Sequence, residues 1–115
     1  QGITVEEINE IITDKLGEIL TSAVFGHNQT PHYVSGDDEL VKTLLAVYER
    51  QTGKKGHEQI IGGGTYGRIF ERGVAFGAQP EDAPMVMHQP NEYMNEQAII
   101  DSIAIYAESI YELTK

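Results

Sequence analysis

Three consecutive glycines, residues 62–64, constrain this chain of 115 residues more than any other feature, because they directly follow the short apolar run at residues 60–61. Glycine has no Cβ, so a turn built from it lets another group approach bare backbone N–H groups. A second apolar run follows at residues 73–77. This order predicts a strand, a tight glycine turn and another strand.

Apolar residues at helical spacing predict three helices, over residues 4–20, 38–51 and 95–113. The first helix is expected to begin with a capping box of Thr4 and Glu7, and Gly53 is a natural stop for the second. A single helical turn is expected within residues 66–72. Strands are expected over residues 21–27, 58–61 and 73–77. The alternation predicts an α/β fold, a mixed sheet with flanking helices.

The charge and composition exclude several classes of partner. A net charge of −10 and a pI near 4.6 argue against nucleic acid and against an anionic membrane surface. With no cysteine, the chain has no disulfides and no thiolate zinc site, which fits a cytoplasmic protein. No apolar stretch approaches the roughly 20 residues of a membrane span, and no signal peptide is recognisable. The chain starts at Gln1, without an initiator methionine, so we expect it to be part of a longer protein.

Gly62, Gly64 and Gly67 formally match the GxGxxG dinucleotide fingerprint. A Rossmann unit needs a long helix after the last glycine, but Gly73 interrupts this segment, and no Lys-Ser/Thr pair follows as in a P-loop. Three interpretations stay open: a structural turn, a nucleotide-binding subdomain, and an anion site. In the anion site, backbone donors with Thr65 and Arg68 would hold a carboxylate or a carbonyl oxygen.

His88 lies on a loop between two prolines, close to the carboxylate of Glu92. A histidine in this setting is a candidate for metal binding or proton transfer, and the alternative is a loop histidine hydrogen-bonded to its neighbours. Zinc takes three or four ligands, and the residues alone do not identify a second one.

The other histidines give weaker signals. His27 and His32 are not at helical spacing and are secondary ligand candidates. His57 and Glu58 begin like a zincin motif, but Ile61 stands where the second histidine belongs.

Three segments in this order, residues 62–68, 73–77 and 87–92, closely resemble the C-terminal segment of PepV-type, carnosinase-like dipeptidases. These dipeptidases belong to the family of co-catalytic zinc peptidases and deacylases that also includes aminoacylases and carboxypeptidase G. The resemblance extends from about residue 30 to the end of the chain. One departure is Gln79-Pro80-Glu81, where relatives usually carry Phe-Pro-Gly.

The resemblance implies a di-zinc site in which His88 is the last zinc ligand and the general base lies outside this chain. It also implies that the glycine loop, with Gly63, Gly64 and Thr65, lines the substrate pocket, and that Arg68 supports it. Residues 1–30 would be the end of a lid domain, and residues 31–115 the C-terminal part of the catalytic domain.

The expected partners are a dipeptide substrate and the missing N-terminal half of the enzyme, whose metal-binding motifs have no counterpart here. Alone, the chain is expected to be inactive, because one histidine cannot hold the metal, and it is expected to be prone to self-association. The alternative is a small stand-alone module that binds an anion or another ligand at residues 62–65.

Overall fold

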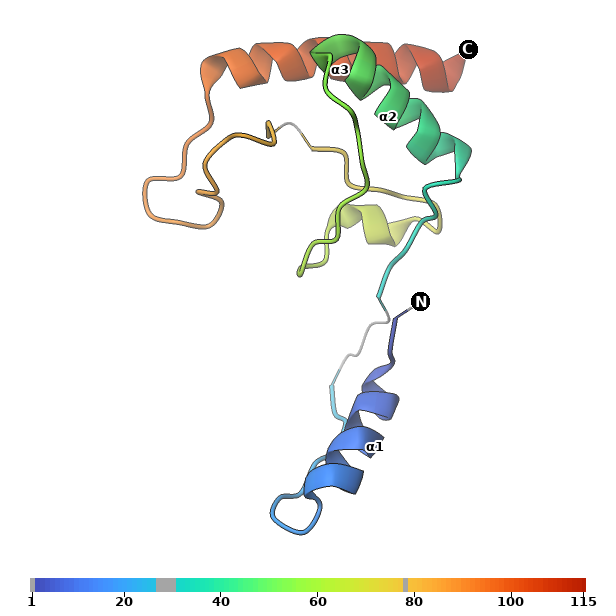
Figure 1. Ribbon diagram of the computed structural model, residues 1–115, viewed down its shortest axis with the longest axis vertical. Coiled ribbons are helices and arrows are strands. Elements are labelled where there is room, and N and C mark those ends of the chain that lie inside the picture. The colour runs from blue at the N-terminus through green and yellow to red at the C-terminus, as the bar shows by residue number, and fades with distance from the viewer. Residues whose placement is uncertain (1, 27–30, 78) are drawn as a thin grey trace. The chain divides into compact units, whose positions relative to one another are not determined.

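The computed structural model describes residues 2–26, 31–77 and 79–115 (Figure 1). The described elements are α1 (Val5–Leu16), α2 (Glu39–Thr52), the 3-10 helix η1 (Tyr66–Ile69) and α3 (Glu96–Thr114). The chain divides into two compact units, Gln1–Tyr33 and Val34–Lys115. The assignment of residues 1–30 to a lid domain and of residues 31–115 to a catalytic domain stays a prediction.

Helix α1 begins with the predicted capping box. The backbone N–H of Glu7 donates to Thr4 Oγ1 at 3.1 Å, and the backbone N–H of Thr4 donates to Glu7 Oε2 at 2.7 Å. The helix ends at Leu16 rather than at residue 20, because a turn follows in which the N–H of Ile19 donates to the carbonyl of Leu16. Beyond the turn, Ser22 donates to Asn9 Oδ1 at 2.6 Å and holds the returning segment against the helix.

Helix α2 has a capping residue at each end, and the stop at Gly53 is the predicted one. Asp38 caps its first turn by accepting from the N–H of Leu40 at 2.9 Å. At the other end Gly53 has a φ of 68°, the left-handed conformation that glycine adopts without a Cβ penalty. The predicted bounds therefore agree with the structure to within one residue at each end.

Helix α3 is capped by Asn95, whose side-chain oxygen accepts from the N–H of Gln97 at 2.8 Å, and it packs against α2 (Figure 1). The buried side chains of the two helices recur every three or four residues and so lie on one face of each. They are Val41, Leu44 and Val47 on α2, and Ala98, Ser102, Ile105 and Ser109 on α3. The two buried serines donate to carbonyls one turn earlier in α3, so burial leaves neither hydroxyl unsatisfied.

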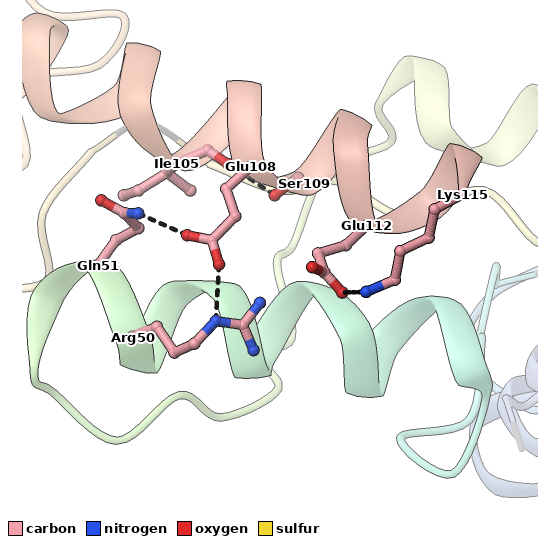
Figure 2. Close-up of polar contacts among 7 residues, drawn as sticks. All are labelled: Arg50, Gln51, Ile105, Glu108, Ser109, Glu112 and Lys115. Atoms are coloured by element: carbon pink, nitrogen blue, oxygen red, sulfur yellow. Dashed lines mark hydrogen bonds and ion pairs between the residues drawn. The ribbon is translucent and has the colours of Figure 1, made fainter.

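A polar cluster crosses the same helix pair near the end of α2 (Figure 2). Glu108 of α3 accepts from Arg50 Nε at 2.6 Å and from Gln51 Nε2 at 2.5 Å. These contacts hold the pKa of Glu108 below its usual value, first through the bond from Gln51 and then through the bond from Arg50. The buried faces of the two helices and this polar cluster together determine how α2 and α3 pack.

The predicted mixed sheet is wrong: within the described residues the regular structure is helical and contains no strand. Of the predicted strands, residues 58–61 and 73–77 lie in extended or bent loops, as do residues 21–26, while residue 27 falls outside the described part. A strand exists only when a neighbour completes its hydrogen-bond ladder, and among the described residues these segments have no such neighbour. Ile60, expected to be buried in a strand, is fully exposed.

A row of apolar side chains at helical spacing also remains on the surface of α3, comprising Ile99, Ile103, Tyr106 and Ile110. In the part of the chain that the structure describes, no helix combines the length and the apolar character needed to cross a membrane.

Candidate functional site

The glycine loop leads directly into η1, and Thr65 organises the junction. Its Oγ1 accepts from the N–H of Gly67 at 3.2 Å, and its carbonyl accepts from the N–H of Arg68 at 3.2 Å. The guanidinium of Arg68 folds back over the loop, where a Cβ added to Gly64 would lie 2.4 Å from Arg68 Nη1. The structure therefore places Gly64, Thr65 and Arg68 in one local cluster, and their role in substrate binding stays a prediction.

Gly62 and Gly63 differ from Gly64 in their surroundings. A Cβ added to either would meet no atom within 4 Å, and both residues are exposed. Their backbone is thus open to a ligand, but the open space also means that packing does not require glycine at these two positions.

The main chain at Gly67 lies close to the main chain at residues 73–74, next to the glycine loop. A Cβ added to Gly73 would lie 2.1 Å from the carbonyl oxygen of Gly67, and one added to Gly67 would lie 3.0 Å from the carbonyl carbon of Val74. Two stretches of main chain meet here without room for side chains. The structural-turn interpretation therefore applies to Gly67 and Gly73, not to the glycine triplet itself.

His88 lies on an exposed loop whose backbone is unusual. Its φ is 62° and that of Asn91 is 61°, both in the left-handed region that residues other than glycine seldom adopt. The backbone N–H of His88 donates to Glu92 Oε2 at 3.1 Å. Two turns reinforce this bond: the N–H of Gln89 donates to the carbonyl of Val86 at 3.0 Å, and that of Glu92 to the carbonyl of Gln89 at 3.2 Å.

The preceding part of this loop is tied to the end of α2. Lys54 Nζ lies 3.3 Å from Asp82 Oδ1. The pKa of Asp82 is lowered, first by a hydrogen bond from its own backbone N–H and then by Lys54. Within the loop, Gln79 Nε2 donates to the carbonyl of Pro84 at 2.9 Å. No spacing in the sequence indicates the pairing of Lys54 with Asp82, because the two residues are far apart in the chain.

The described residues do not by themselves form a metal site. Residues 2–26, 31–77 and 79–115 contain no group of three His, Cys, Asp or Glu side chains placed to hold an ion. Of the other histidines, His27 lies outside the described residues, His32 is exposed, and His57 faces Gln59 with a 3.4 Å separation between the two Nε2 atoms. His88 fits one nitrogen position of a zinc site, whose remaining donors would have to come from elsewhere.

The two halves of the expected site remain separate in the described contacts. Gly64, Thr65 and Arg68 form one local cluster, whereas the hydrogen bond that the structure describes for His88 stays within its own loop. The sequence pattern indicated the residues of each half, but it did not predict the hydrogen bond between the His88 N–H and Glu92. The only indication of this bond in the sequence is a carboxylate four residues after His88.

Comparison with protein families identifies the class of protein to which these loops belong. The model of peptidase family M20/M25/M40 matches residues 8–112. The match covers both compact units, nearly from end to end. The chain therefore belongs to this peptidase family.

Individual relatives are similar along the same length. The chain is 60% identical over 115 residues to the Beta-Ala-Xaa dipeptidase of Lactobacillus delbrueckii subsp. lactis, covering 100% of this chain and 24% of that protein. It is 44% identical over 110 residues to a protein of Staphylococcus saprophyticus subsp. saprophyticus named "Putative dipeptidase", covering 93% of this chain and 24% of that protein. The chain thus spans about a quarter of the length of these curated relatives.

Proposed function

We propose that this chain is the C-terminal part of a zinc dipeptidase, in which it supplies one metal ligand and part of the substrate pocket. The observation that carries the proposal is the similarity of the whole chain to the Beta-Ala-Xaa dipeptidase, at 60% identity. This identity spans both the glycine loop and the His88 loop.

His88 is the residue proposed to bind the metal. Its backbone N–H is engaged by Glu92, and the ring is exposed, so a ring nitrogen can serve as a donor. When two zinc ions are bound, they supply Lewis-acid activation of water and of the scissile carbonyl. The other ligands and the general base would come from the rest of the enzyme, which leaves this chain inactive alone.

The glycine loop is proposed to hold the substrate. A dipeptide carries a free carboxylate, and an arginine guanidinium can bind it through two parallel hydrogen bonds, which favours Arg68 for this role. The Thr65 hydroxyl already accepts from Gly67 but keeps its own hydrogen for donation. The open backbone at Gly62 and Gly63 adds N–H donors beside them.

The test uses the longer enzyme that contains this chain, with His88→Ala as the variant. Loss of a directly coordinating side chain is expected to lower zinc content and dipeptide hydrolysis together. His57→Ala is the control and should retain both. Hydrolysis and zinc content at the level of the unsubstituted enzyme in His88→Ala would refute the ligand assignment.

A complementary test uses the 115-residue chain alone and mixed with the remaining part of the enzyme. No hydrolysis by the chain alone, followed by activity on mixing, is the expected result. Tight stoichiometric zinc binding by the isolated chain would instead favour a stand-alone module with ligands such as His27, His32 or His57.

A further inference from the structure

The loop that carries His88 is held in an uncommon backbone conformation by a side chain of its own. His88 and Asn91 both have φ near +60°, at 62° and 61°. Side chains with a Cβ favour the right-handed region, so a histidine settles at positive φ only when its surroundings compensate. Glu92 provides the compensating contact, because its Oε2 accepts from the His88 N–H at 3.1 Å.

This bond acts on the main chain of His88 and leaves its ring unengaged. In the described part of the chain, the ring makes neither a hydrogen bond nor an ion pair. A carboxylate is a stronger acceptor than a neutral oxygen, so Glu92 suits the task of holding one N–H in place on an exposed loop. The direction of the Cα–Cβ bond of His88, and so the position of its ring, follows from the backbone conformation that Glu92 stabilises.

We propose that Glu92 is a positioning residue that presents the His88 imidazole to the metal by fixing the left-handed backbone of this loop. The inference rests on the proposed function, because it concerns a ligand of that zinc site. Partners that orient a metal ligand from outside the coordination sphere commonly contribute tenfold to a hundredfold in metal affinity. Glu92 would do so through the ligand's main chain rather than through its ring.

Glu92→Ala and Glu92→Gln separate this role from a general effect of charge. Alanine removes the acceptor, whereas the glutamine side-chain oxygen can accept the same N–H at nearly the same length. Glu81→Ala is the matched control, since Glu81 is an exposed carboxylate near the same loop with no hydrogen bond or ion pair that the structure describes. None of these changes removes a proposed metal ligand.

The first measurement is the rate of amide hydrogen exchange at His88. It is made by NMR on the 115-residue chain without metal. Glu92→Ala is expected to speed exchange at His88 and to shift its amide proton, because the N–H loses its acceptor. Glu92→Gln and Glu81→Ala should stay close to the unsubstituted chain. This readout does not depend on zinc or on activity.

The second measurement is the affinity of the longer enzyme for Zn²⁺, determined by competition with a chelator. Glu92→Ala is expected to weaken binding about tenfold to a hundredfold, with Glu92→Gln restoring most of the loss and Glu81→Ala neutral. Unchanged affinity and exchange in Glu92→Ala would overturn the positioning role, as would equal losses in the alanine and glutamine variants. If His88→Ala binds Zn²⁺ as tightly as the unsubstituted enzyme, the proposed function fails instead.

Discussion

Glu108 on α3 accepts a hydrogen bond from Arg50 on α2 at 2.6 Å, across 58 positions of the chain (Figure 2). The adjacent bond from Gln51 makes the carboxylate a bridge between the two helices. A second long-range pair lies at the start of α2, where Arg72 donates to both oxygens of Asp38 at 2.9 and 2.8 Å. These two carboxylates connect α2 to α3 and to the segment after η1.

The stability of Val34–Lys115 is expected to fall in acid, because both carboxylates have lowered pKa values. The pKa of Asp38 is lowered first by Arg72 and then by the N–H of Leu40. A folded-state pKa below the unfolded one means that the unfolded chain binds more protons as the pH falls. The stabilisation is therefore complete above the unfolded values, about 4 for Asp and Glu, and is lost as the pH falls through the folded values.

Thermal unfolding followed by circular dichroism from pH 7 down to pH 3 checks this expectation. Glu108→Gln should lose part of the pH dependence and Glu81→Gln should keep all of it. The effect of Glu108→Gln should shrink in high salt, since exposed ion pairs are screened. A pH profile of Glu108→Gln that matches the unsubstituted chain would show that the bridge contributes nothing through its charge.

Gly73→Ala is expected to disturb the main chain next to the glycine loop. The added Cβ would lie 2.1 Å from a backbone oxygen of Gly67, so the main chain must move, and crowding of this kind typically costs about 1–3 kcal/mol. Gly62→Ala is the matched control, because its Cβ would meet no atom within 4 Å. Denaturant unfolding compares the two, and equal stability of both variants would contradict the close approach.

Leu44→Ala is expected to lower the free energy of unfolding by about 2–5 kcal/mol, the usual range for a buried leucine. Leu44 is only 7% exposed and lies on the face of α2 that packs on α3. The control is Ile60→Ala, in which a fully exposed side chain is shortened and a change near zero is expected. The midpoint of urea unfolding measures both, and a large loss in Ile60→Ala would mean that this residue is buried after all.

The sequence by itself determined the three helices and most of their ends, but not the end of the first helix, which stops at Leu16 rather than at residue 20. The Thr4–Glu7 capping box, the Asp38 and Asn95 caps and the stop at Gly53 all act within a few residues, so each was readable from the local pattern. It also singled out Gly63, Gly64, Thr65 and Arg68, which adjoin one another in the chain, and their role in substrate binding stays a prediction.

Only the tertiary structure decided whether the extended segments would pair as strands. Residues 58–61 and 73–77 have the composition of strands, yet a strand requires a partner in space, and a run of apolar residues does not specify one. The pairing of Arg50 with Glu108, the meeting of Gly67 with Gly73 and the left-handed backbone of His88 were likewise invisible in the pattern. Each depends on where distant or competing groups come to rest, which is settled by packing and hydrogen bonding of the whole chain rather than by local preference.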